Sequence, residues 1–572
     1  MIQEIKPAPR HFLDQGFTVK EWSQIEPYFQ QLLVRNLDSV EALKQWFKDR
    51  SELESVLSED MAWRYIRMTC DTTDDKIREA FEFFVSEIEP KIAPLANELN
   101  KKALESPHLG ALRKEIGYDI MIRSMEKDFK NFREKNIPIQ TEIQKESQRF
   151  GAISGAMSVT IAGKEFTLQQ AAVLLQETDR AKREKVYRQI ADRRLQDKDT
   201  LNELYTKLIQ LRHQVAVNAD YENFRDYMFS AMGRFDYSPT DCFDFHISVE
   251  VEVVPFLHEF AQRRKETLGV DALRPWDKAV DPEGKQPLKP FDGGKDLTSK
   301  TIECFNRLDP FLGDCLKTME KMGHLDLESR KGKAPGGYNY PLAETGVPFI
   351  FMNATSTVRD MVTILHEGGH AVHSFLTRDM ELNDFKNTPS EVAELASMSM
   401  ELLSMDHWDV YFSNPEELKR AKKEHLEQII ETLPWVAAID KFQHWIYENP
   451  EHGLHERLFI WNEIHDAFSD EVTDWSGLEE QKKHVWQKQL HLFEVPFYYI
   501  EYGMAQLGAI AVWKNFKEDP KKGLEGYMNA LKLGYTRSIP EVYAAANIKF
   551  DFSREYIKEL MDFVKQELDA LN

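Results

Sequence analysis

Residues 357–377 read TVRDMVTILHEGGHAVHSFLT, and their apolar side chains return every three to four positions. Such spacing is typical of a helix with one buried face. Thr357 is followed three residues later by Asp360, a pair that can close the first turn of a helix with reciprocal hydrogen bonds. The sequence therefore predicts a helix that begins directly after Thr357. Its apolar positions are Val362, Leu365, Ala371, Val372 and Phe375.

The same spacing dominates the rest of the chain. Apolar stripes mark helices near residues 40–47 and 75–90, and another from about residue 199 onward. Three stretches break the pattern: 157–168 reads as two short strands around an Ala162-Gly163-Lys164 turn, 281–300 as a surface loop, and 331–353 as a glycine-rich loop leading into a strand over 348–352. We expect an all-α, mainly helical fold with a small β component.

The composition excludes several classes of protein. The chain has 572 residues, of which 42% are hydrophobic and 30% charged, as in soluble globular proteins. Its 73 Lys and Arg against 96 Asp and Glu leave a net charge of −23, which repels nucleic-acid phosphates. We see neither a membrane-spanning apolar run nor a signal peptide, and four cysteines are too few for a disulfide framework or a cysteine zinc site. We expect a soluble, cytoplasmic protein that binds neither nucleic acid nor membranes.

The motif His366-Glu367-Gly368-Gly369-His370 is an HExxH sequence on the predicted helix. Residues four apart project from one helix face, so both imidazoles can bind one zinc ion. Glu367 lies beside the first histidine, where its carboxylate can reach a water on the metal without binding the metal itself. Zinc lowers the pKa of such a water toward about 7, and the glutamate can take its proton.

A catalytic zinc site needs a third protein ligand and one open position. The metzincin extension is excluded, because His373 and Leu376 stand where that class needs Gly and His. The next helix offers Glu391, Glu394 and Glu401 as ligands. Thr388 and Glu391 form a predicted capping box with Pro389 at the first helical position, which occupies Glu391 and favours Glu394.

Three further residues are expected to surround the ligands without binding the metal. Glu401 lies about two turns beyond Glu394 on the same helix face, where it can orient a ligand histidine. Glu391 and His373 are the other two, and for each of the three a solvated or packed side chain is the alternative interpretation.

At these residues the chain resembles the M3 family of zinc metallopeptidases, the group of thimet oligopeptidase and oligoendopeptidase F. The stretch 366–373 resembles the family's HExGHxxH signature, and 393–397 resembles its segment around the ligand glutamate, which supports Glu394. Further similarity lies in 221–227, 336–338, 348–353 and 534–540, so it covers most of residues 200–560 and is closest to the oligoendopeptidase F branch. One departure is Gly368, where many members carry Phe or Leu; we expect looser packing there.

The resemblance implies an almost wholly helical fold in which two lobes clasp a deep channel with one zinc ion per chain at its floor. It implies an N-terminal helical lobe with a short hairpin over residues 1–200 and a catalytic region over 201–572. Such a channel admits short unstructured peptides and excludes folded proteins.

The resemblance also suggests residues for the other half of the site. In the family a tyrosine-rich segment supplies phenols that face the zinc, and Tyr498 and Tyr502 best match that spacing, whereas a further family tyrosine falls at Ala505. His491 is a candidate partner of the substrate carbonyl or backbone, and Tyr499 a candidate substrate contact. An aromatic core segment is the alternative.

Substrate contacts are also predicted near the glycine-rich loop. Gly336 and Gly337 lack side chains and can let a peptide approach, next to Tyr338. The strand over 348–352 has an edge that can pair with an extended peptide. An ordinary connecting loop is the alternative interpretation.

Together these features predict a zinc endopeptidase that cleaves internal bonds of short peptides, with water activated by the metal and Glu367 as general base. The alternatives are an exopeptidase that releases C-terminal dipeptides, and a non-catalytic peptide-binding protein. The sequence does not indicate an oligomeric state.

Overall fold

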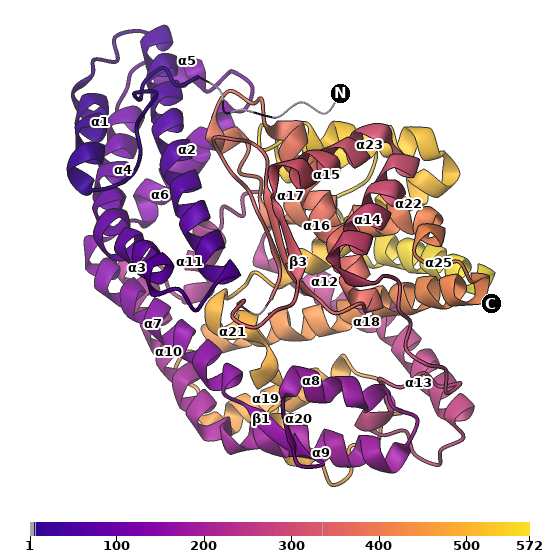
Figure 1. Ribbon diagram of the computed structural model, residues 1–572. Coiled ribbons are helices and arrows are strands. Elements are labelled where there is room, and N and C mark those ends of the chain that lie inside the picture. Colours follow the sequence, from indigo (N-terminus) through magenta and orange to yellow (C-terminus); the bar gives the residue numbers. More distant parts are fainter. Residues whose placement is uncertain (1–4, 6, 8, 335, 572) are drawn as a thin grey trace. The chain divides into compact units, whose positions relative to one another are not determined.

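The computed structural model describes residues 5, 7, 9–334 and 336–571. The chain is mainly helical with two small sheets, which confirms the predicted fold class (Figure 1). It forms two compact units that alternate along the sequence: Met1–Lys130, Leu288–Lys422 and Ala505–Phe550 make the first, and Asn131–Pro287, Lys423–Met504 and Asp551–Asn572 the second. The predicted domain boundary at residue 200 falls inside a helix of the second unit, and this division stays a prediction. The predicted channel between two lobes also stays a prediction.

The first unit contains most of the N-terminal helices and the HExxH helix. Its elements are α1 (Trp22–Val34), α2 (Val40–Cys70), α3 (Asp75–Phe83), α4 (Glu89–Leu104), α5 (Leu109–Leu112), α6 (Tyr118–Asn131), α14 (Gly293–Leu308), α15 (Pro310–Met322), β3 (Leu325–Glu328), β4 (Tyr338–Tyr340), β5 (Phe349–Ala354), α16 (Val358–Thr377), α17 (Ser390–Leu403), α23 (Pro520–Leu531) and α24 (Ile539–Ala545). A π-helical turn, Phe84–Ile88, joins α3 to α4 across the predicted helix near 75–90.

The longest helix of the second unit is α18 (Pro415–Glu448), which begins in the first unit's part of the chain. Its other elements are α7 (Ile137–Gly155), β1 (Ser158–Ile161), β2 (Lys164–Thr167), α8 (Leu168–Val173), α9 (Arg180–Gln196), α10 (Lys198–Asn218), α11 (Phe224–Ala231), α12 (Pro239–Glu252), α13 (Val254–Leu268), α19 (Leu454–Ala467), α20 (Glu479–Lys483), α21 (Leu490–Glu494) and α25 (Arg554–Ala570). The boundary at residue 504 falls inside α22 (Ile500–Glu518).

Local signals explain where two of these elements form. Thr357 Oγ1 accepts a hydrogen bond from Asp360 N at 3.2 Å, and the Asp360 carboxylate accepts one from Thr357 N at 3.0 Å, so α16 begins with the predicted capping box. The predicted hairpin is also present, since β1 and β2 pair antiparallel. Ala162 and Gly163 both have positive φ, 52° and 81°, as a two-residue turn between twisted strands requires.

The second sheet has the order β3-β5-β4, with β5 in the middle. β3 pairs parallel to β5, and β4 pairs antiparallel to it. The predicted strand near 348–352 is confirmed, but its expected role as a pairing edge is wrong, because both of its edges are occupied. Among the described residues, β4 is one of the two edge strands.

Two predicted local structures are wrong. The expected surface loop over 281–300 ends early, because α14 begins at Gly293; Glu328 Oε1 accepts a hydrogen bond from Gly294 N at 2.7 Å and so caps the helix from β3. The Thr388–Glu391 capping box does not form, because α17 begins at Ser390 with Pro389 as the N-cap residue. The Pro389 carbonyl instead accepts the backbone N–H groups of Val392 and Ala393, each at 3.0 Å.

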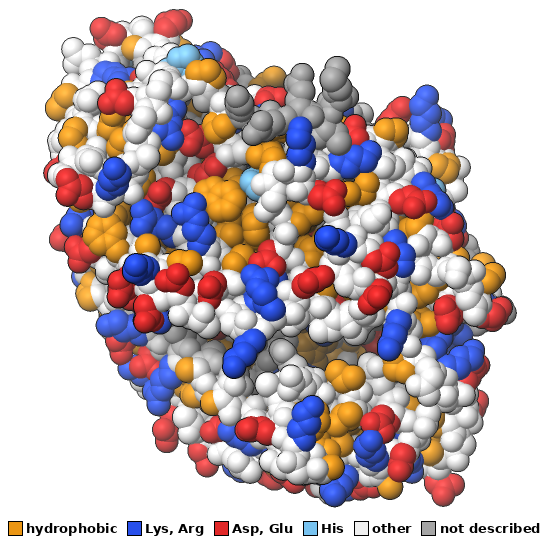
Figure 2. Space-filling model, viewed as in Figure 1, with side chains coloured by type: hydrophobic (Ala, Val, Ile, Leu, Met, Phe, Trp, Pro, Cys, Tyr) orange, Lys and Arg blue, Asp and Glu red, His pale blue; other side chains and the backbone are white. Residues whose placement is uncertain are grey.

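The surface mixes charges of both signs. Figure 2 shows Lys and Arg side chains interspersed with Asp and Glu over the face that it draws. Among the described residues, no helix is long and apolar enough to cross a lipid bilayer.

Charged groups are also buried, notably at Asp277 in the second unit. Asp277 accepts hydrogen bonds from Arg183 Nη2 at 2.9 Å and Arg180 Nη2 at 2.7 Å, and its side chain is fully buried. Arg183 is 2% exposed, so it depends on this carboxylate for its charge partner. The pair joins α9 to the segment after α13.

We predict that Asp277→Asn destabilises the protein by about 3–5 kcal/mol, because it leaves the Arg183 guanidinium buried without a compensating charge. The measurement is the thermal unfolding midpoint by circular dichroism. Asp271→Asn is the matched control, since Asp271 lies in the same segment but is exposed. Equal midpoints for the two variants would contradict the assignment.

Candidate active site

The centre of the site is the contact between α16 and α17, which lie side by side in the first unit (Figure 1). Gly369 makes this contact possible. A Cβ atom at this position would lie 2.6 Å from the Ala396 carbonyl oxygen and 2.6 Å from Ser397 Cα. Since any side chain would collide with the backbone of α17, glycine sets the separation of the two helices.

Two tyrosines hold α17 from the C-terminal part of the unit. The Tyr527 hydroxyl donates to the Ala396 carbonyl at 2.7 Å, and the Tyr543 hydroxyl donates to the Glu391 carbonyl at 3.1 Å. Both rings are buried. They therefore support α17 on α23 and α24, next to its contact with α16.

This packing brings together the three predicted metal ligands. Glu394 Oε2 lies 3.2 Å from His366 Nε2 and 3.8 Å from His370 Nε2. Zinc–ligand bonds of about 2.0–2.1 Å in a tetrahedral arrangement separate neighbouring ligand atoms by about 3.3 Å. The donor set thus fits a zinc ion. The imidazoles are 20% and 19% exposed, so a fourth position at such an ion faces accessible space.

Two further side chains orient the ligands. His366 Nδ1 donates to Glu401 Oε1 at 2.6 Å, which aims Nε2 toward Glu394 as predicted for a carboxylate behind a ligand histidine. Ser397 Oγ donates to Glu394 Oε2 at 3.2 Å. This role of Ser397 was not predicted, although its position three residues after Glu394, about one helical turn away, is the signal for it.

Glu367 is 8% exposed and lies beside these groups. Burial raises the pKa of its carboxyl to about 7, against a smaller opposing effect of His366. Asn339 Nδ2 donates to the Glu367 backbone carbonyl at 3.1 Å and ties β4 to α16. The small β component therefore does lie next to the predicted zinc site.

The remaining residues expected around the ligands are buried. Burial lowers the pKa of His373 to about 4, and its Nε2 has no hydrogen-bond partner among the described residues. Glu391 is 2% exposed. Since the capping box is absent, the reason for setting Glu391 aside is invalid, although it is the Glu394 carboxylate that approaches both histidines.

Gly368 does not loosen the packing, contrary to expectation. A Cβ atom there would lie 2.6 Å from the Phe305 ring. Phe305, from α14, therefore fills the space that a side chain at position 368 would otherwise take.

The glycine-rich loop packs against its own sheet. Gly336 has φ of 100°, a conformation that favours glycine, and a Cβ atom at Gly337 would lie 3.3 Å from the Phe351 carbonyl oxygen. The Tyr338 ring stacks on Phe351 with a centroid separation of 4.8 Å, and its hydroxyl lies 2.6 Å from Thr69 Oγ1. These contacts account for the conformation of the loop without any bound peptide. The predicted substrate contacts of Gly336, Gly337 and Tyr338 therefore stay predictions.

The aromatic residues predicted to stabilise an oxyanion lie in the second unit, where they form one cluster. Ring centroids are 5.3 Å apart for Tyr498 and Tyr502, and 5.9 Å apart for His491 and Tyr502. Tyr498 lies in the turn before α22, and Tyr502 in its first helical turn. Gln489 Nε2 lies 2.7 Å from His491 Nδ1 and orients that ring. Burial raises the pKa of Tyr499 to about 12, against hydrogen bonds with Trp435 and Gln489.

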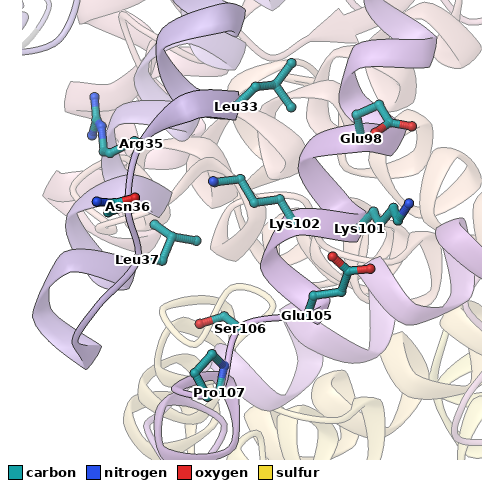
Figure 3. A pocket seen from close by; sticks show the side chains of 10 residues that line it. All are labelled: Leu33, Arg35, Asn36, Leu37, Glu98, Lys101, Lys102, Glu105, Ser106 and Pro107. Carbon is teal, nitrogen blue, oxygen red and sulfur yellow. The ribbon is translucent and has the colours of Figure 1, made fainter.

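A separate pocket of about 360 Å³ opens between the end of α1 and the end of α4 (Figure 3). Leu33 and Leu37 line one side, and Lys102 and Glu105 the other. The pocket shares no residue with the His366 group, and its charges are mixed, so we assign it no part in the candidate site.

Comparison with known sequences decides the family. The profile of peptidase family M3 matches residues 173–293 and 311–562, more than half of the chain and all of the His366–Glu394 region. The profile of the peptidase M3 N-terminal domain matches residues 12–132. The chain belongs to peptidase family M3.

Curated members of the M3 family are similar over part of their length. "Oligopeptidase PepF" of Bacillus subtilis is 24% identical over 340 residues, which cover 58% of this chain and 49% of the relative. "Oligoendopeptidase F homolog" of Lactococcus lactis is 20% identical, over 59% of this chain and 55% of the relative. The chain thus spans about half the length of these relatives.

Solved structures match over nearly the whole chain. PZ peptidase A, solved with an inhibitor, superposes with a TM-score of 0.89 and 25% identity over 97% of this chain and 99% of its own. Oligoendopeptidase-F from Enterococcus faecium shares the fold, with a TM-score of 0.63 and 16% identity over 96% of this chain and 97% of its own.

We predict that Gly369→Ala lowers stability by about 1–3 kcal/mol or more and weakens zinc binding, because its methyl group pushes the α17 backbone away from α16. Unfolding midpoints and zinc content after dialysis are the measurements. Gly368→Ala is the matched control, since the atoms nearest its methyl group belong to the Phe305 side chain and not to the backbone of α17. A Gly369→Ala protein that binds zinc like Gly368→Ala would contradict the close-contact account.

Proposed function

We propose that this M3 family member is a zinc-dependent endopeptidase that hydrolyses internal bonds of short unstructured peptides. The observation that carries the proposal is the convergence of His366, His370 and Glu394 on one point, with Glu367 buried beside them. A protein that only binds peptides does not need a carboxylate base next to a metal-binding site.

His366, His370 and Glu394 would hold one zinc ion per chain. When bound, the ion supplies Lewis acidity that polarises a carbonyl and makes water more acidic. Glu401 and Ser397 orient two of these ligands through the hydrogen bonds described above. No more than three protein ligands converge among the described residues, as catalytic rather than structural zinc sites require.

Glu367 acts as the general base. It accepts a proton from the attacking water and passes it to the amine of the leaving peptide. Burial supports this role, because a carboxylate held away from solvent accepts a proton more readily.

Tyr498 and Tyr502 stabilise the negative charge that develops on the carbonyl oxygen, and His491 assists by contacting the substrate. Their clustering within the second unit supports a common role. Phenol donors aimed at such an oxygen contribute about 2.7–4 kcal/mol each. Tyr499 has a supporting part, because its ring packs against His491 with a centroid separation of 4.7 Å.

The substrate is a peptide in extended form. Of the sheet's two edge strands, β4 is the one tied to α16, through Asn339. A peptide that pairs with β4 would place its backbone beside the helix that carries Glu367. The names of the relatives, oligopeptidase and oligoendopeptidase, support short peptides as substrates.

We expect Glu367→Gln to lower kcat by about 10²–10⁴-fold or more, because the amide cannot accept the proton. The measurement uses an internally quenched peptide of about eight residues, with zinc content determined on both proteins. The variant should keep its zinc, since Glu367 is not a ligand. Substantial residual turnover in a zinc-loaded variant would contradict the general-base role.

The same assay with an amidated peptide separates endopeptidase from exopeptidase. An endopeptidase cleaves free and amidated peptides alike at internal bonds. An enzyme that releases C-terminal dipeptides needs the free carboxylate, so loss of cleavage on amidation would favour the exopeptidase.

Tyr502→Phe should reduce kcat by about 10²–10³-fold with a smaller change in KM, because it removes a donor used in the transition state. Tyr499→Phe is the matched control: it removes the phenol hydroxyl of a neighbouring tyrosine, whose ring lies 5.6 Å from that of Tyr502. Equal kcat values for the two variants would contradict a catalytic role for Tyr502 and indicate that its side chain serves only in packing.

A further inference from the structure

A second group of metal-binding side chains lies in the second unit. Cys242 on α12, and Asp440 and His444 on α18, each offer one ligand atom, and these atoms all lie within 4.8 Å of one another. The group shares no residue with the His366 site.

The spacing of these residues explains how the helices form the group. Cys242 and His246 are four apart on α12, and Asp440 and His444 are four apart on α18, so each pair projects from one helix face. His246 Nε2 donates to Asp440 Oδ2 at 2.8 Å, which joins the two pairs. Two facing helices thus present sulfur, nitrogen and oxygen donors to one place.

The polar atoms of this group are poorly satisfied. Nε2 of His444 lies 3.2 Å from Asp440 Oδ2, yet without the direction of a hydrogen bond. Among the described residues, Asp440 Oδ1 and both ring nitrogens of His444 have no hydrogen-bond partner. Buried polar atoms in proteins rarely lack a hydrogen-bond partner. The 3.2 Å separation equals that between His366 Nε2 and Glu394 Oε2 at the first site, and suits two ligands of one ion.

Charge supports the same conclusion. The side chains of Asp440, His246 and His444 are 0%, 2% and 2% exposed, and among the described residues neither Lys nor Arg pairs with Asp440. A carboxylate buried with only histidines for partners is costly. A divalent cation would balance the charges of the Asp440 carboxylate and a Cys242 thiolate together.

We propose that Cys242, Asp440 and His444 bind a second zinc-type ion in the second unit, with His246 orienting Asp440. A thiolate with an imidazole selects borderline transition metals such as Zn²⁺ or Co²⁺ over Mg²⁺ and Ca²⁺. The ligands' full burial distinguishes the group from the partly exposed His366 site.

The ion would fix the turn that contains Tyr498. Phe497 has φ of 66°, an unfavourable value for a residue with a side chain. Gln443, beside His444 on α18, accepts a hydrogen bond from Phe497 N at 2.7 Å, and the Phe497 and His444 rings are 5.4 Å apart. An ion on His444 would stiffen the surface on which this turn rests.

Cobalt replacement tests the proposal without using activity. A Co²⁺–thiolate bond gives a charge-transfer absorption in the near ultraviolet, and the His366 site has no cysteine to produce one. Chelator-stripped protein titrated with Co²⁺ should bind two ions per chain and show this band. Cys242→Ser should lose the band and one ion, whereas Cys315→Ser, at another buried cysteine, should keep both.

Glu394→Ala separates this proposal from the proposed function. That variant leaves the second group unchanged, so it should keep the band while losing the ion at the His366 site, and it decides the matter even if Cys242→Ser does not fold. If the wild-type chain binds a single Co²⁺ ion and shows no thiolate charge-transfer absorption, the proposal is wrong. Asp440 and the two histidines would then form a hydrogen-bonded network without a metal. This experiment does not measure peptide cleavage. Its result would therefore stand even if the protein proved not to be a peptidase.

Discussion

The backbone contact between α16 and α17 at Gly369 is the constraint on which the candidate site depends. A helix places His366 and His370 on one face by its own geometry, but it cannot supply the third ligand. That ligand must come from another element brought within about 4 Å of the imidazoles, and a side chain at position 369 would prevent the approach. The candidate metal-binding site therefore depends on helix packing as much as on the HExxH motif.

The surrounding structure stabilises this contact from several directions. Phe305 fills the space beside Gly368, while Tyr527 and Tyr543 hold the carbonyl groups of α17. Asn339 links the small sheet to the backbone of Glu367. These contacts come from two stretches of the first unit that are far apart in the sequence, residues 288–422 and 505–550.

Local signals in the sequence predicted what local interactions determine. The Thr357 capping box, the α16 helix and the Ala162-Gly163 turn each depend on residues a few positions apart, and all three are present. Glu394 was also singled out, but partly through a Thr388 capping box that does not form. The prediction of Glu394 as a ligand keeps its second, independent reason, the family resemblance.

Features that depend on distant residues were missed or wrong. The start of α14 depends on Glu328, 34 residues beyond Gly294 in sequence, and the pairing of β5 depends on partners on both sides. His246 and Asp440 are 194 positions apart, so their group has no sequence motif. Packing at Gly368 likewise followed from Phe305, which no periodicity identifies. How the aromatic cluster of the second unit serves the reaction stays a proposal from resemblance.

The most direct test of the metal seat is anomalous X-ray diffraction from crystals of the zinc-loaded protein, recorded on both sides of the zinc absorption edge. We predict an anomalous peak bonded to His366 Nε2, His370 Nε2 and the Glu394 carboxylate, with Glu401 still hydrogen-bonded to His366. Absence of a peak at these atoms, or a peak bonded to Glu391 in place of Glu394, would contradict it.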